Sequence, residues 1–183
     1  MPGASFLPYS CQTIDKQDID AVVDVLNSDM LTTGPKVEEF EAALADRTGV
    51  GEAVVCGNGT QALHLALMAA GIGEGDSVIV PAITFLATAN AVRYCGAEVI
   101  FADVDAATGL LTPETLQQAL DTHPHARIRA VMPVHLGGHC VDMAAIRKLA
   151  DEHGLTIIAD SCHALGGSYQ GHAVGSCVYA DFA

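Results

Sequence analysis

Positive charge is scarce in this sequence of 183 residues. Eight Lys and Arg side chains stand against 22 Asp and Glu, which gives a formal net charge of −14. A chain with this balance repels the phosphates of nucleic acids and the headgroups of anionic lipids, so we expect neither as a partner. No apolar segment approaches the length of a membrane span, which is about 20 residues. No amino-terminal segment combines basic residues, an apolar core and a small-residue cleavage site, as a signal peptide would. These absences predict a soluble protein.

Closely spaced cysteines and flexible linkers are also missing. The six cysteines lie far apart, with no C-x-x-C pair, at Cys11, Cys56, Cys95, Cys140, Cys162 and Cys177. This spacing favours free thiols in a reducing cytoplasm and disfavours both a disulfide framework and a zinc site, so we predict no bound metal. There is no Gly/Ser-rich or Pro-rich linker, no internal repeat and no low-complexity tract. With 50% apolar residues, the chain is expected to form one domain around one core.

The hydrophobic periodicity predicts two helices followed by alternating strands and helices. The first helix covers 15–28, with Thr13 as its cap, and the second runs from Pro35 to about Gly49. The later helices are expected at 60–70, 84–95, 113–120 and 144–153, and the strands at 53–56, 77–80, 98–103, 128–134 and 155–160. This βαβα order predicts a three-layer α/β fold with a mainly parallel sheet and right-handed crossovers.

Asp160 ends the last predicted strand, a nearly all-apolar run typical of a buried parallel strand. The carboxyl ends of parallel strands form the edge where ligands bind in open α/β sheets. A carboxylate there is costly unless donors or a cation meet it. Two interpretations remain open on these residues alone. Asp160 is a turn or cap residue, or it is the anion that pairs with the cationic ring nitrogen of pyridoxal phosphate.

Residues 57–63, Gly-Asn-Gly-Thr-Gln-Ala-Leu, form a tight glycine turn that opens a predicted helix. Unpaired backbone N–H groups at such a helix start bind phosphate, and Asn58, Thr60 and Gln61 offer further donors. Plain turn chemistry explains the same residues, and the glycine spacing also resembles a dinucleotide-binding fingerprint. That fingerprint requires an acidic residue at the end of the next strand. The strand ends Ser-Val-Ile-Val-Pro at 77–81, which weakens a nicotinamide-binding interpretation.

Other unusual residues follow predicted strands. Phe85 is placed to stack on a planar ring, although in isolation a core position is favoured for it, as for most apolar aromatic residues. For His135 we favour a local hydrogen-bonding role, and for Cys162 and His163 a structural role over a nucleophile or metal ligand. These residues, together with 58–61 and Asp160, all fall at carboxyl ends of predicted parallel strands. A phosphate cradle, a ring platform and an anion are therefore expected on one edge.

Three longer motifs carry a family resemblance. Residues 57–67, 81–91 and 160–166 resemble the DegT/StrS family of pyridoxal phosphate-dependent nucleotide-sugar aminotransferases. Residues 9–10, 31–35, 133–135 and 174–176 resemble most the branch that aminates a UDP-linked 4-keto sugar of the pseudaminic acid pathway. The resemblance implies the large domain of a fold-type I aminotransferase, working as a homodimer with active sites at the subunit interface. Residues 1–183 would hold most of this large domain, without the small carboxy-terminal domain.

The resemblance also implies roles for individual residues. Thr60 and the Gln61 backbone N–H would bind the cofactor phosphate, beside Gly59 and with Asn58 where the family usually has Ser. Phe85 would stack on the pyridine ring, Asp160 would pair with its nitrogen, and His163 would lie beside the ring. The pocket for the nucleotide sugar would be bordered by Tyr9, Asp29, Met30, Leu31 and Thr32.

The family's Schiff-base lysine is expected beyond Ala183. Lys16, Lys36 and Lys148 fall on predicted surface helices, and none is placed to replace it. The resemblance therefore implies the amino-terminal part of an enzyme that moves an amino group, typically from glutamate, to a UDP-linked 4-keto-6-deoxy sugar for cell-surface or flagellin glycans. The fragment alone is expected to be inactive. The alternative is a remnant or regulator of the same fold that binds cofactor or nucleotide sugar without catalysis.

Overall fold

The computed structural model describes residues 11–183, so the substrate-pocket assignment of Tyr9 lies outside the described residues. The chain divides into two compact units, Met1–Phe40 and Glu41–Ala183. The first contains α1 (Lys16–Leu26) and the start of α2 (Pro35–Thr48), which continues into the second. Asp15, and not Thr13, caps α1, because its carboxylate accepts the N–H groups of Gln17 and Asp18. An ionised Asp is as good a cap as Thr and also complements the helix dipole.

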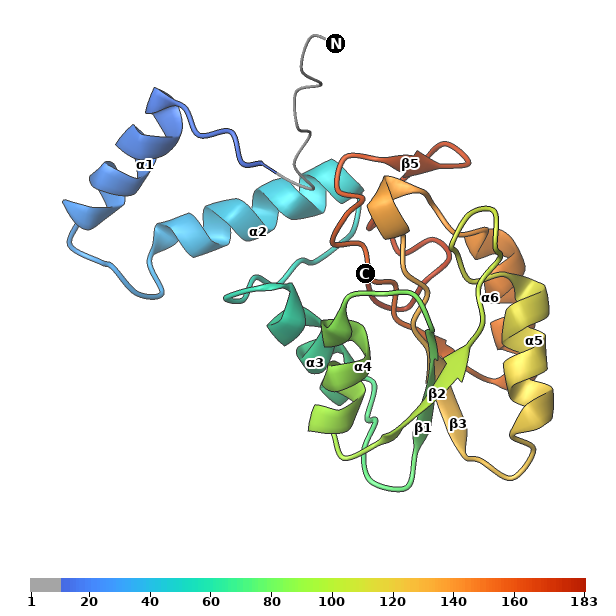
Figure 1. Ribbon diagram of the computed structural model, residues 1–183. Coiled ribbons are helices and arrows are strands. Elements are labelled where there is room, and N and C mark those ends of the chain that lie inside the picture. The colour runs from blue at the N-terminus through green and yellow to red at the C-terminus, as the bar shows by residue number, and fades with distance from the viewer. Residues whose placement is uncertain (1–10) are drawn as a thin grey trace, which may run out of the picture. The chain divides into compact units, whose positions relative to one another are not determined.

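The second unit contains the alternating strands and helices (Figure 1). In chain order its elements are α3 (Gly59–Ala69), β1 (Ser77–Pro81), α4 (Leu86–Tyr94), β2 (Glu98–Ala102), α5 (Pro113–Thr122), β3 (Ile128–Val131), a 3₁₀ turn (Leu136–Gly138), α6 (Met143–His153), β4 (Thr156–Ile157), β5 (Ser168–Tyr169) and β6 (His172–Ala173). All the predicted helices are therefore present, and none of their ends differs from the prediction by more than two residues.

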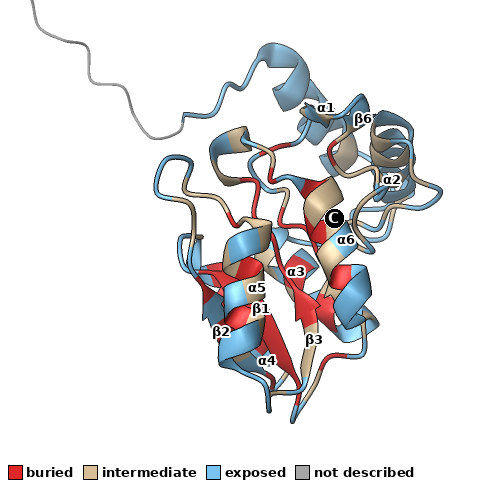
Figure 2. Cartoon of the chain, turned by 90° about the vertical axis from the view of Figure 1, so that its right-hand side faces the viewer, coloured by how far each residue is buried: buried red, intermediate tan, exposed pale blue. Residues whose placement is uncertain are grey.

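A four-stranded parallel sheet, in the order β2-β1-β3-β4, forms the middle layer of this unit. Successive residues of β1 point to opposite faces, so Val78 and Val80 join the core formed with α3 and α4, whereas Ile79 joins the core formed with α5 and α6. Figure 1 shows these helix pairs on opposite sides of the sheet, and Figure 2 shows buried residues along β1 and β3. The predicted three-layer α/β architecture is confirmed.

The prediction of a strand at 53–56 is wrong. The segment has no regular secondary structure and no strand partner in the described part of the chain, and Val54 is 81% exposed. The backbone N–H of Val55 instead donates to the Glu41 carboxylate at 3.0 Å. A strand requires a neighbour that supplies the ladder hydrogen bonds, and apolar composition cannot provide one.

The carboxyl-terminal part of the sheet is less regular than predicted. β3 and β4 are short, and pairing continues beyond them only as single bridges, Val134 with Asp160 and Ile158 with Phe182. The antiparallel hairpin of β5 and β6 is not predicted by the sequence pattern, because its two-residue strands are too short to show a period. No helix among residues 11–183 is both long enough and apolar enough to cross a bilayer.

Candidate functional site

Asp160 lies at the carboxyl edge of the sheet and is only 6% exposed. Its backbone is held between the strand ends, because its N–H donates to the Pro133 carbonyl at 2.8 Å and its carbonyl accepts the His135 N–H at 3.0 Å. Its carboxylate accepts two further hydrogen bonds. The Thr88 hydroxyl donates to Oδ2 at 2.8 Å, and the Cys162 backbone N–H donates to Oδ1 at 3.2 Å. Each oxygen of this buried carboxylate thus has at least one donor, and the Cys162 thiol also hydrogen-bonds to the carboxylate.

The first turn of α3 faces the same edge. Asn58 caps this helix, since its Oδ1 accepts the backbone N–H of Gln61 at 3.0 Å. The Gln61 side chain turns back and accepts the Gly57 N–H at 2.9 Å. The Gln61 N–H, predicted to hold a phosphate, is therefore engaged by the cap. The first-turn N–H groups of Gly59 and Thr60 have no intrahelical partner and remain suited to an anion.

One pocket of about 220 Å³ joins these residues to others at the strand ends. It is lined by Gly59, Thr60, Leu63, Thr84, Phe85, Ala87, Val134, Asp160, Cys162 and His163. Five predicted cofactor-binding residues, Gly59, Thr60, Phe85, Asp160 and His163, are thus brought together from α3, α4 and the end of the sheet. Asn58 and Gln61 do not line the pocket and contribute by shaping the start of α3.

Phe85 precedes α4 and is 71% exposed although it belongs to the most apolar class of side chains. In this chain Phe85 is therefore not packed into the core, and its ring is available as a wall of the pocket. His163 lies on the same wall, where its Nδ1 accepts the backbone N–H of Gly137 at 3.2 Å. With this nitrogen acting as an acceptor, a neutral His163 carries its proton on Nε2.

Cys162 packs closely against the start of α3. A Cβ atom at Gly59 would lie 2.8 Å from the Cys162 sulfur, so a larger residue there would require the Cys162 side chain to move. Partial burial, together with the hydrogen bond to Asp160 and the negative charge of Asp160, raises the pKa of the Cys162 thiol to about 11. The thiolate is the nucleophilic form, so this environment supports the structural role predicted for Cys162.

The raised pKa makes a testable prediction. At pH 8 a thiol with a pKa near 11 is about 10⁻³ ionised, whereas an ordinary thiol is ionised to roughly a fifth. We expect iodoacetamide to alkylate Cys162 about 10²-fold more slowly in the native protein than in the same protein unfolded in urea. The rate should rise as the pH increases toward the folded-state pKa. Mass spectrometry of the Cys162 peptide measures both rates, and equal rates would contradict the assigned environment.

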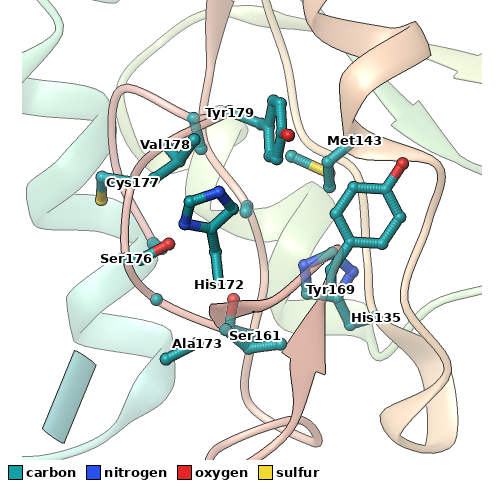
Figure 3. Close-up of a pocket in the computed structure, with 15 residues that line it drawn as sticks. His135, Met143, Ser161, Tyr169, His172, Ala173, Ser176, Cys177, Val178 and Tyr179 are labelled. Carbon is teal, nitrogen blue, oxygen red and sulfur yellow. The ribbon is translucent and has the colours of Figure 1, made fainter. Parts of the chain in front are cut away.

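His135 lies in a different, smaller pocket of about 40 Å³, shown in Figure 3 beside Ser161, Tyr169 and His172. Its Nδ1 accepts the Val141 backbone N–H at 3.2 Å, as expected for a local hydrogen-bonding role. Burial lowers the pKa of His135, while the charge of Asp160 acts in the opposite direction. His135 is therefore neutral near pH 7 and adds no positive charge next to Asp160.

Two residues near Asp160 were missed by sequence reasoning. Thr88 is fully buried on α4, and its hydroxyl lies 2.7 Å from that of Thr84. Their spacing of four residues at a helix start is the signal in the sequence, because it places both hydroxyls on one face. Only the fold reveals that this face meets Asp160, which is 72 residues further along the chain.

The predicted substrate residues Asp29, Met30, Leu31 and Thr32 lie in the connection from α1 to α2, within the first unit, and all four are exposed. None of the three lysines is among the residues that line the pocket described above. Lys16 and Lys36 pair with acidic residues of their own helices, and Lys148 on α6 lines an outer groove with residues of α5. Residues 11–183 contain no cluster of three or more His, Cys, Asp or Glu side chains that could hold a metal ion.

Chemically, the pocket offers the carboxylate of Asp160, the aromatic ring of Phe85, and the start of α3 with the hydroxyl of Thr60. Such a set suits a planar ring that carries a cationic nitrogen and a phosphate. Its volume of about 220 Å³ is below the roughly 300 to 1,000 Å³ of pockets for drug-sized ligands, as expected for one small substituted ring.

Comparisons with known proteins agree with this geometry. Residues 12–182 match the DegT/DnrJ/EryC1/StrS aminotransferase family. The UDP-4-amino-4-deoxy-L-arabinose--oxoglutarate aminotransferase of Shewanella sediminis is 40% identical over 178 residues, which are 96% of this chain and 45% of that protein. The chain thus spans less than half the length of this relative.

Solved structures show the same similarity. An aminotransferase from Psychrobacter cryohalolentis has a TM-score of 0.84 and 39% identity, covering 92% of this chain and 42% of that one. The protein Spr1654 from Streptococcus pneumoniae, in its PLP form, has a TM-score of 0.84 and 31% identity, covering 93% of this chain and 46% of that one. A PMP form of Spr1654 is similar to the same extent.

Proposed function

Because this chain belongs to the DegT/DnrJ/EryC1/StrS aminotransferase family, we propose that the whole protein is a pyridoxal 5′-phosphate-dependent aminotransferase acting on a nucleotide sugar. The observation that carries the proposal is the meeting of Asp160, Phe85 and Thr60 around one pocket. When bound, the cofactor supplies an electron-withdrawing ring that stabilises negative charge on the substrate carbon that loses a proton.

The described residues fit this cofactor in three respects. The buried Asp160 carboxylate supplies a negative charge opposite a ring nitrogen, with both oxygens already oriented by donors. The exposed ring of Phe85 supplies a stacking surface. Thr60 and the adjacent N–H groups at the start of α3 supply donors for a phosphate. His163 completes the wall beside the ring.

For the substrate we propose a UDP-linked 4-keto sugar, with glutamate as the amino donor. Sequence motifs favour a 4-keto-6-deoxy sugar of the pseudaminic acid pathway, whereas the name of the Shewanella sediminis relative refers to a 4-amino-4-deoxy pentose. Both products carry the new amino group at C4, so the shared chemistry is amination of a 4-keto sugar. Tyr9, Asp29, Met30, Leu31 and Thr32 are proposed to border the nucleotide-sugar pocket, and the catalytic lysine to follow residue 183.

We also propose that the whole protein works as a homodimer in the cytoplasm. Support for self-association comes from α1, which has no buried residue and exposes Ile19, Val22, Val23 and Leu26 at helical spacing. An exposed apolar stripe of this kind is typical of an interaction surface. Light scattering of the whole protein should give twice the mass of one chain, and a monomer would contradict the proposal.

The proposed activity is tested with the whole protein. Glutamate should convert the bound cofactor to its amino form, and a UDP-4-keto sugar should convert it back with formation of an amino sugar detected by mass spectrometry. Comparing a 4-keto-6-deoxyhexose with a 4-keto pentose distinguishes the two substrates. A catalytically inactive remnant or regulator would bind cofactor or nucleotide sugar and show neither half-reaction.

Thr60 provides a test of the phosphate position. We expect Thr60→Val in the whole protein to weaken pyridoxal phosphate binding by about 1.5 to 3 kcal/mol, the range for a hydrogen bond to a charged group. This corresponds to a roughly 10- to 10²-fold increase in Kd, measured by equilibrium dialysis. Thr60→Ser keeps the hydroxyl and should bind nearly as well as the unchanged protein. Unaltered affinity in Thr60→Val would place the phosphate elsewhere.

A further inference from the structure

Thr88 is a polar side chain with no exposed surface, 0% by relative area, on the first turns of α4. Its hydroxyl is within 2.8 Å of Asp160 Oδ2 and 2.7 Å of the Thr84 hydroxyl. An ionised carboxylate only accepts hydrogen bonds, so the single hydroxyl proton of Thr88 points to Asp160. The contact between the two threonines then requires Thr84 to be the donor. The result is a directed relay from Thr84 through Thr88 to Asp160.

This relay determines which way the carboxylate faces. Oδ1 is held by the Cys162 N–H and Oδ2 by Thr88, so the two donors orient the carboxylate about its last torsion. An ionised carboxylate has about four acceptor positions, so the donors from Thr88 and Cys162 leave capacity for a ligand in the pocket. Thr84 lines the pocket, whereas Thr88 lies behind Asp160 and does not line it. Thr88 therefore acts on a pocket ligand only through Asp160.

The orientation of the Asp160 carboxylate matters because no other negative charge lines the pocket. Asp160 is the only carboxylate among the residues that line the pocket, which otherwise includes the titratable side chains of Cys162 and His163. Burial lowers the pKa of His135, which is therefore neutral near pH 7. The raised pKa of the Cys162 thiol keeps that thiol protonated. No neighbouring group described above supplies a second negative charge to replace that of Asp160.

We propose that Thr88 is a positioning residue that keeps the charge of Asp160 directed at the cofactor's ring nitrogen and so maintains the proton on that nitrogen. This rests on the proposed function. Removing the hydroxyl leaves Oδ2 against an apolar surface, and a buried carboxylate oxygen without its donor is strongly disfavoured. Asp160 then rotates toward another donor or takes up a proton itself. Both responses reduce the negative charge that faces the ring, so both lower the proton affinity of the ring nitrogen.

The test is a pH titration of the ring nitrogen by ¹⁵N NMR, using ¹⁵N-labelled pyridoxamine phosphate bound to the whole protein. The readout does not depend on turnover. We expect Thr88→Val, which keeps the shape of the side chain, to lower the ring-nitrogen pKa by about one unit, a tenfold change in proton affinity. Thr88→Ser keeps the donor and should restore the unchanged titration. A purely structural role predicts a lower melting temperature in Thr88→Val and no change in the titration.

Thr84→Val provides a second variant should Thr88→Val fail to fold. It removes the outer donor of the relay and should lower the proton affinity of the ring nitrogen by a smaller factor, about two- to threefold. An unchanged titration in Thr88→Val, or in Thr84→Val where only that variant folds, would overturn the inference while leaving the proposed function intact. If the unchanged whole protein fails to bind pyridoxamine phosphate, the proposed function and this inference are both overturned.

Discussion

Asp160→Asn is expected to slow the half-reaction with the amino donor by about 10²- to 10³-fold in the whole protein, with the fold retained. The substitution keeps the size and shape of the side chain and removes its charge. Without that charge the ring nitrogen is less often protonated, and the negative charge developing on the substrate carbon is less stabilised. Loss of an electrostatic term of about 3 to 4 kcal/mol in the transition state gives this rate change.

Stopped-flow absorbance of the cofactor's conversion to its amino form measures this rate, beside a melting curve for each variant. Asp103→Asn is a matched control, because Asp103 directly follows β2, is exposed and does not line the pocket. If Asp160 were only a strand-end cap, Asn would serve about as well as Asp, and turnover would stay within a few-fold of the unchanged protein. That outcome would remove the assignment of Asp160 to the ring nitrogen.

The second large effect concerns stability. Leu67 on α3 is 0% exposed and belongs to the core formed with Val78 and Ile158, whereas Leu65 on the same helix is 48% exposed. We expect Leu67→Ala to lower the free energy of unfolding by about 2 to 5 kcal/mol, because it removes buried methyl groups and leaves a cavity. Leu65→Ala should change it by no more than about 0.5 kcal/mol.

The pair isolates the effect of burial. Both substitutions replace Leu by Ala within one helix, so their contributions from helix propensity are nearly equal. Urea unfolding followed by circular dichroism measures both, since this chain contains no tryptophan as a fluorescence probe. Equal destabilisation by the two variants would contradict the packing of α3 against the sheet. Because Thr60 lies in the first turn of α3, its position in the pocket would then also be in question.

Binding of the cofactor and catalysis need not fail together in this protein. In the proposed enzyme, the start of α3 and the ring of Phe85 are assigned to cofactor binding, and Asp160 with its relay is assigned to supplying the charge. Loss of Thr60 should therefore reduce affinity with little effect on the rate of the bound state. Loss of the Asp160 charge should reduce the rate more than the affinity. This separation is the reason for measuring Kd and rate in each variant.

The sequence by itself determined the order of the helices, the parallel three-layer fold, and the meeting of residues 59–60, Phe85, Asp160 and His163 at one edge of the sheet. These features depend on local signals: hydrophobic period, caps, glycine turns, and the rule that parallel strands end at a common edge. The motifs at 57–67, 81–91 and 160–166 also pointed to the family that residues 12–182 match. Where the local signal was ambiguous, as with Thr13 and Asp15, the wrong cap was predicted.

Only the tertiary structure decided which groups meet. The segment 53–56 has strand-like composition but no partner, and pairing is a property of two segments that one segment cannot reveal. Asn58 engages the Gln61 N–H that was assigned to a phosphate, and His135 turns to a pocket other than that of Asp160. Thr88 reaches Asp160 across 72 residues of chain because α4 packs on the sheet beside the end of the last strand. Such a contact depends on how elements distant in the sequence pack together, and hydrophobic periodicity within one segment does not reveal it.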